Sequence, residues 1–244
     1  PTLALVDPEL SKTTPSGVTA SAGLDVICHA IESFISKPYH QREKPNSPDD
    51  RPPYQGSNPV SDIWSLKAID LGGKFLSKAV QNGEDIEAKG NMMLSATLAG
   101  IGFGTAGVHI PHACAYPIAG LKHSYQASGY KKKFVPHGIS VIVTAPAAFR
   151  FTYDVNPEKH IKAAELLKGS VIDNPSLESL PNELIKLMKE VGVPSGIKDL
   201  GYEKKDISEI VVGAMKQQRL LSIAPKDVSE NDLNQILIQS IENW

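Results

Sequence analysis

Residues 18–36 read VTASAGLDVICHAIESFIS, and this stretch decides the fold. Large apolar side chains recur in it at helical spacing, namely Leu24, Ile27, Ile31, Phe34 and Ile35. Val26 and Ala30 cover much of the opposite side, so the predicted helix is apolar nearly all round. A helix of that kind is typical of the interior of a domain. The stretch therefore predicts a buried central helix.

One polar stripe interrupts this apolar surface, formed by Asp25, His29, Glu32 and Ser36. Asp25 and His29 are four residues apart, so their side chains are neighbours on one helix face. A carboxylate and an imidazole presented together on a buried helix suit a divalent metal. An Asp–His hydrogen bond inside the core would use the same pair, and the stripe alone leaves both interpretations open.

Further histidines lie in two short patches. Residues 107–120 read GVHIPHACAYPIAG and carry His109 and His112, and residues 134–141 read FVPHGISV and carry His137. A buried metal site needs three or four ligands, which Asp25, His29 and two of these histidines would supply. Each histidine alone is equally typical of a turn, and spacing does not show that the patches converge.

The rest of the chain predicts a mostly α domain. Residues 2–7, TLALVD, indicate a short strand, and the Pro-rich residues 37–59 indicate a long functional or mobile loop. Six more helices are expected: one from Asn58-Pro59, one over 84–100, one from Asn156-Pro157, and three over 181–192, 203–218 and 229–244, the last capped by Ser229 and Asp232.

Residues 102–107 match the GxGxxG pattern of a dinucleotide-binding loop. That loop requires a strand before it and a phosphate-binding helix after it. Here the helical segment 91–99 precedes the glycines and Pro111 follows soon after. We therefore expect close backbone packing at a helix end, where glycine removes the side-chain obstacle.

Composition narrows the functional classes. With 41% apolar residues and a net charge of −2, the chain is typical of a globular protein. Its one basic run, Lys131–Lys133, is isolated, so nucleic acid is not an expected partner. No apolar stretch is expected to reach the about 20 residues that span a bilayer. Cys28 and Cys114 form no disulfide framework and favour a reducing compartment. No signal or transit sequence is visible at Pro1, where the early strand indicates a piece of a longer protein.

Four segments in order carry a family resemblance: LALVDPEL (3–10), GLDVICHAIES (23–33), PHACAYPIAG (111–120) and VPHG (135–138). Over essentially all 244 residues the chain resembles the iron-containing (group III) alcohol dehydrogenases. The segments 51–64 and 100–109, with Tyr116 and the insertion before Pro136, look most like the mitochondrial hydroxyacid-oxoacid transhydrogenase branch. The resemblance implies the dehydroquinate synthase-like fold, with residues 1–10 as a junction strand from an α/β nucleotide-binding domain and residues 11–244 as the all-helical metal-binding domain.

The same resemblance implies roles for single residues. It places the metal ligands on Asp25, His29, His112 and His137, and it passes over His109. It also places catalytic roles on His137 and Tyr116, and cofactor binding on Leu10. Many relatives carry a histidine where this chain has Tyr116, so a hydrogen bond to substrate and a packing role both stay open there.

The implied activity is hydride transfer from 4-hydroxybutyrate to 2-oxoglutarate through a bound NAD(H), giving succinic semialdehyde and 2-hydroxyglutarate. The implied metal is Fe²⁺, and Zn²⁺ suits the same ligands. The dinucleotide would be bound mostly by the other domain, in the mitochondrial matrix. The hydroxyacid and oxoacid are the expected partners, no nucleic acid or membrane is expected, and a homo-oligomer is left open.

Two other functions remain open. The protein could be an NAD-dependent iron alcohol dehydrogenase that releases its cofactor, or, as a fragment, a non-catalytic metal-binding domain. Substrate carboxylates need cationic partners, for which Arg42, Arg51 and Lys122 are candidates. Solvent-facing charges are the alternative for each of the three.

Overall fold

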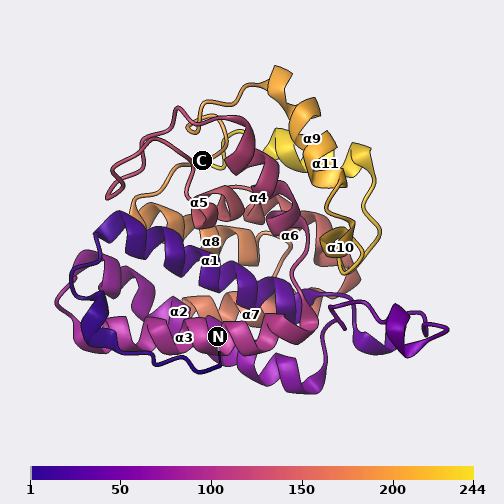
Figure 1. Cartoon of the computed structure of the whole chain (residues 1–244), viewed down its shortest axis with the longest axis horizontal. Coiled ribbons are helices and arrows are strands. Elements are labelled where there is room, and N and C mark those ends of the chain that lie inside the picture. Colours follow the sequence, from indigo (N-terminus) through magenta and orange to yellow (C-terminus); the bar gives the residue numbers. More distant parts are fainter. Residues whose placement is uncertain (1) are drawn as a thin grey trace.

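The computed structural model describes residues 2–244 and confirms a mostly helical domain (Figure 1). Its α-helices are α1 (Ser16–Ile35), α2 (Pro59–Gln81), α3 (Ile86–Ala106), α4 (Ile110–Leu121), α5 (His137–Ile142), α6 (Ala145–Thr152), α7 (Pro157–Lys168), α8 (Ser179–Val191), α9 (Ile207–Met215), α10 (Gln218–Leu221) and α11 (Glu230–Gln239). Short 3₁₀ helices are η1 (Pro8–Ser11), η2 (Tyr39–Gln41), η3 (Pro48–Asp50), η4 (Tyr153–Val155) and η5 (Lys204–Asp206).

Helix α1 runs through the middle of the molecule, as its sequence predicts. It packs against α2, α3 and α5, and Figure 1 shows α2, α3 and α7 on one side of it and α4 to α6 on the other. By length and composition its 20 residues would suit a membrane span, although no stretch of that kind was predicted from the sequence. About two thirds of that apolar window (67%) is buried inside the bundle, as in the core helix of a globular domain.

Three predicted helix starts are confirmed by their caps, whereas the single helix predicted over 203–218 is divided into η5, α9 and α10. Asn58 directly precedes Pro59, the first residue of α2, and its side chain accepts hydrogen bonds from the backbone N–H groups of Val60 and Ser61. Asn156 does the same for α7, and Ser229 with Asp232 forms a capping box at α11. These polar side chains satisfy backbone N–H groups that have no partner within the helix, which is why the short motifs predict where helices begin.

The predicted N-terminal strand is wrong for the residues that the structure describes. Residues 2–7 adopt no regular structure, and η1 follows directly. Leu3 and Leu5 are almost fully exposed. A strand is stabilised by hydrogen bonds to a neighbouring strand, and residues 2–244 contain only isolated bridges elsewhere. An apolar run alone cannot supply that partner.

The glycine-rich segment is a helix end, as predicted. Helix α3 continues through Gly102 and Gly104 and ends before Gly107, whose φ of 89° favours glycine. A Cβ on Gly102 would lie 2.5 Å from Ser65 Oγ, so the glycine permits close packing of α3 on α2. After Gly107 the chain turns by 106° into α4. The motif therefore sets the direction of α4 and forms no dinucleotide loop.

Residues 37–58, here called the arm, project from the end of α1 (Figure 1). A bridge between Pro38 and Ser57 closes its base. Gln55 N–H donates to the Thr105 carbonyl at 2.7 Å, which ties the base to the end of α3. The long loop predicted from the sequence is thus an anchored projection with two short 3₁₀ helices, η2 and η3.

Candidate metal centre

Three helices bring the predicted ligands together. Helix α1 presents Asp25 and His29 one turn apart, the first turn of α4 presents His112, and His137 is the first residue of α5. The sharp turn after α3 points the start of α4 at α1. Gly138 allows α5 to approach α1, since a Cβ there would lie within 3.0 Å of the Ser21 carbonyl.

The four side chains converge around one buried carboxylate oxygen. Asp25 Oδ1 lies 3.4 Å from His112 Nε2, 3.7 Å from His137 Nε2 and 3.7 Å from His29 Nδ1. His29 Nε2 and His112 Nε2 are 3.0 Å apart. Ligand atoms of Asp25, His112 and His137 all lie within 4.8 Å of one another. The convergence that spacing could not show is therefore present in the tertiary structure.

This arrangement fits a divalent cation. Asp25 Oδ1 is buried and accepts no hydrogen bond from residues 2–244, although a lone buried carboxylate oxygen is costly. The surrounding imidazole nitrogens are close enough to share one central ligand with it. One carboxylate and three imidazoles form a donor set suited to Fe²⁺ or Zn²⁺. The alternative from the sequence was an isolated hydrogen bond between Asp25 and His29. It does not explain why His112 and His137 also lie next to Asp25.

The electrostatics of the cluster differ between its histidines. Burial and the neighbouring His112 lower the pKa of His29 to about 4, so its ring is neutral at pH 7. Burial opposes protonation of His112 too, but the negative charge of Glu32 and contacts with Asp25 outweigh it and raise its pKa to about 9. Burial also opposes ionisation of Asp25, yet the adjacent imidazoles lower its pKa. Asp25 is therefore an anion at neutral pH.

Two residues near the cluster were given no role by the sequence analysis. Glu32 is fully buried, and its Oε1 lies 2.5 Å from His112 Nδ1. Phe103 stacks on His29 with ring centroids 4.2 Å apart and an angle of 17°. The signal for Glu32 was visible, because it lies one turn beyond His29 on the polar stripe of a buried helix. Phe103 carried no such signal, since its position depends on how α3 packs.

His109 and Tyr116 lie at the border of the cluster. The His109 ring is fully buried, but its Nδ1 is 3.9 Å from Glu32 and neither ring nitrogen has a hydrogen-bond partner within residues 2–244. It lies outside the four converging groups. Tyr116 is 44% exposed, with its ring centroid 6.0 Å from that of His137. It lies on the rim, where a hydrogen bond to a ligand and simple packing remain the two alternatives.

The candidate cations for substrate carboxylates occupy different positions. Lys122 Nζ donates to Asp206 at 2.6 Å and to the Gly201 carbonyl at 2.7 Å, which favours a structural role. Arg51 is exposed on the arm. Arg42, also on the arm, has a buried Nη1 without a hydrogen-bond partner in the described part of the chain. Leu10, predicted to contact the cofactor, is 79% exposed on η1.

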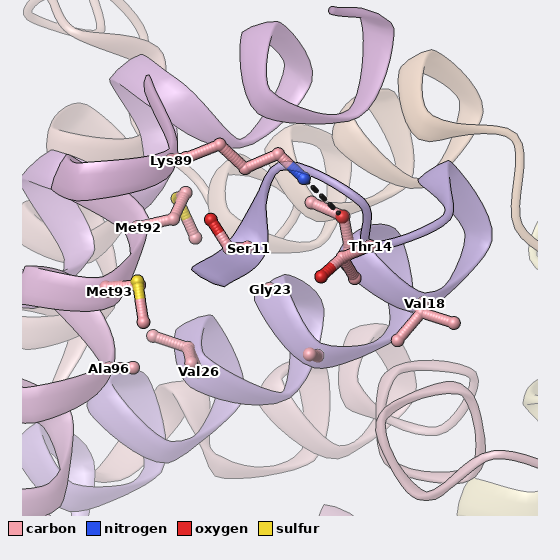
Figure 2. Close-up of a pocket in the computed structure, with 11 residues that line it drawn as sticks. Ser11, Thr14, Val18, Gly23, Val26, Lys89, Met92, Met93 and Ala96 are labelled. Atoms are coloured by element: carbon pink, nitrogen blue, oxygen red, sulfur yellow. Dashed lines mark hydrogen bonds between the residues drawn. The ribbon is translucent and has the colours of Figure 1, made fainter. Parts of the chain in front are cut away.

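A separate cavity of about 170 Å³ lies between η1, α1 and α3 (Figure 2). Its walls are mostly apolar and include Val26, Met92 and Met93. The buried Lys89 Nζ donates to Thr19 Oγ1 at 3.0 Å. In Figure 2 this bond is the dashed line that starts at Lys89. The predicted ligands do not line this cavity, so it is distinct from the metal centre.

Known proteins resemble this chain in sequence and in fold. The model of the "Fe-containing alcohol dehydrogenase family, C-terminal" matches residues 54–241. "Hydroxyacid-oxoacid transhydrogenase, mitochondrial" from Bos taurus is 43% identical over 99% of this chain and 53% of its own length, and that from Homo sapiens is 44% identical over 96% and 51%. The crystal structure of a 1,3-propanediol oxidoreductase superposes with a TM-score of 0.79 at 28% identity, covering 96% of this chain and 54% of that one. The chain thus spans about half the length of the curated relatives it matches.

Proposed function

Because the chain belongs to the Fe-containing alcohol dehydrogenase family, we propose that it forms the metal-binding half of an oxidoreductase acting on small hydroxyacids and oxoacids. The observation that carries this proposal is the convergence of Asp25, His29, His112 and His137 around one buried carboxylate oxygen. One carboxylate and three imidazoles at this junction of three helices are donors that a divalent metal such as Fe²⁺ accepts. In this proposal these residues hold Fe²⁺, with Zn²⁺ as the alternative.

When bound, the metal would supply a Lewis acid that stabilises negative charge on the alcohol oxygen while the carbon bearing that oxygen gives up a hydride, and NAD(H) would carry the hydride. The chain's own residues prepare the site for that chemistry. Asp25 supplies a negative charge, and the low pKa of His29 keeps a lone pair available on its ring at pH 7. Phe103 covers one face of that ring and excludes water from it. In this proposal Tyr116, half-exposed beside His137, would donate a hydrogen bond to a substrate at the rim.

Within the family we propose the transhydrogenase reaction, in which 4-hydroxybutyrate reduces a retained cofactor and 2-oxoglutarate reoxidises it, in the mitochondrial matrix. The support is the identity of 43% over 99% of the chain to relatives with that name. The arm adds a physical reason, because a projection anchored at the end of α1 and α3 could slow release of a cofactor more than exchange of small acids. Arg42 and Arg51 on the arm would then meet the substrate carboxylates.

The experiment follows the hydride itself. The full-length protein is mixed with 4-hydroxybutyrate deuterated at C4 and with 2-oxoglutarate, without added NAD. The proposal expects deuterium on C2 of 2-hydroxyglutarate, and an Asp25→Ala variant should abolish the transfer. Product that forms only when NAD is supplied would favour an ordinary dehydrogenase.

The 244-residue chain by itself is expected to transfer no hydride. The only dinucleotide-loop pattern singled out in its sequence is the end of α3, where Gly102 packs against Ser65 of α2. The measurement is NADH formation by the purified chain with added NAD, metal and 4-hydroxybutyrate. Turnover under these conditions would show that the residues present suffice to bind the cofactor. Tight metal binding without turnover in the full-length protein would instead favour a non-catalytic metal-binding domain.

A further inference from the structure

We propose that Glu32 is a positioning residue for the metal centre: its buried carboxylate fixes the orientation and tautomer of His112 and supplies the second negative charge of the site. The inference rests on the proposed function, since it assumes that His112 is a metal ligand. It goes beyond the four ligands, because Glu32 contacts His112 on the side of the ring that faces away from the centre and acts through that residue.

The two nitrogens of the His112 ring face opposite surroundings. Nε2 points to the centre, 3.0 Å from His29 Nε2 and 3.4 Å from Asp25 Oδ1. Nδ1 lies 2.5 Å from Glu32 Oε1 on the other side of the ring. An ionised carboxylate can only accept a hydrogen bond, so Nδ1 carries the proton. In the neutral ring the lone pair is then on Nε2, which is the atom that faces the other ligands.

The second carboxylate oxygen holds the backbone that carries His112. Glu32 Oε2 accepts the His109 backbone N–H at 2.6 Å. His109 is the residue before α4, so this bond fixes the start of the helix whose first turn presents His112. A negative charge at that point also interacts favourably with the dipole of α4. One carboxylate therefore restrains both the main chain and the ring of the same ligand.

The burial of Glu32 has an electrostatic consequence. Its side chain is fully buried, and its ionic contacts within residues 2–244 are with His109 and His112, not with Lys or Arg. A buried carboxylate is costly to maintain unless it is paired, and the partners of Glu32 are imidazoles, not permanently charged side chains. A divalent cation at the centre would balance two carboxylates, Asp25 and Glu32. Removing the charge of Glu32 while keeping its shape should therefore weaken metal binding, even though Glu32 does not touch the metal.

The experiment measures affinity for Co²⁺, whose visible spectrum reports ligand geometry, in the full-length protein with a competing chelator. Glu32→Gln keeps the shape and an acceptor oxygen but loses the charge, and it should weaken Co²⁺ binding about 10- to 100-fold. Glu32→Ala removes the acceptor as well and should weaken it further and change the spectrum. Ser33→Ala is the matched control, because Ser33 is equally buried on α1 and its hydroxyl bonds to Ser65 at 2.9 Å, away from the centre.

A second measurement separates positioning from stability. In the Zn²⁺-loaded protein, the ¹⁵N spectrum of labelled histidine should show His112 protonated at Nδ1, and Glu32→Ala should lose or broaden that signal. If Glu32→Gln binds Co²⁺ as tightly as the unmodified protein, or if Ser33→Ala loses as much affinity, the inference is overturned while the proposed function stands. If Asp25→Ala leaves Co²⁺ binding unchanged, the proposed function itself fails.

Discussion

Replacing Gly138 with Ala tests whether the contact between α5 and α1 builds the metal centre. A Cβ at this position would lie 1.9 Å from the Ser21 carbonyl oxygen and 3.0 Å from Asp25 Cβ. Ordinary contact begins near 3.4 Å, so the two helices must separate by roughly 3.4 − 1.9 = 1.5 Å at this point. The obstacle is backbone, which cannot rotate away as the end of a long side chain can. Because His137 directly precedes Gly138, any such movement carries it away from Asp25.

The expected magnitudes follow from this displacement. Overpacking of a close contact costs about 1–3 kcal/mol of the free energy of unfolding. A misplacement of about 1 Å in a catalytic group can lower turnover about 100-fold. The assays are urea unfolding, metal content after dialysis, and the transfer of deuterium between the two acids. We expect all three to fall in Gly138→Ala, with metal content falling even at temperatures where the variant is folded.

A glycine on another helix of the site provides the control. Gly120 lies in α4, and a Cβ there would meet no atom within 4 Å in residues 2–244. Gly120→Ala should therefore keep metal and activity, and the better helix propensity of alanine should stabilise the protein by about 0.5–1 kcal/mol. If Gly138→Ala retains its metal and unfolds at the same urea concentration as the unmodified protein, the close approach of α5 to α1 does not determine the site.

Three further predictions concern other parts of the molecule. Burial lowers the pKa of His160 to about 4, below its usual 6.5. The neutral ring therefore makes a contribution to stability that is complete above pH 6.5 and is lost, by up to about 3 kcal/mol, as the pH falls toward 4. Urea unfolding between pH 7.5 and 4.5 should show a flatter dependence of stability on pH for His160→Gln than for the unmodified protein. His112→Ala should empty the metal centre. His109→Ala should keep bound metal and lose about 3 kcal/mol of stability. The opposite result in metal analysis would place the ligand one turn away. Lys159 Nζ donates to the Phe34 carbonyl at 2.7 Å and to Asp62 at 2.9 Å, beside the base of the arm. Lys159→Met should therefore destabilise the protein by about 1–3 kcal/mol and speed proteolysis of the arm. Unchanged cleavage would show that this contact does not hold the arm.

The sequence by itself determined the elements whose causes are local. Helix α1 follows from apolar spacing, and the pairing of Asp25 with His29 follows from the geometry of one helical turn. The helix starts at Asn58 and Ser229 follow from side chains that cap backbone N–H groups within three residues. Such features depend on neighbours in the chain, so a short motif contains all the information they require.

Only the tertiary structure decided the features whose causes are distant in the chain. The apolar run at residues 2–7 predicted a strand, but a strand requires a partner that no local pattern can supply. Glu32 meets His112 across 80 residues, and Phe103 covers His29 only because α3 crosses α1. The cluster itself forms because Gly138 lets α5 lie against α1. These contacts depend on how whole helices pack. Steric fit and burial decide that packing, and they act between surfaces that are far apart in the chain.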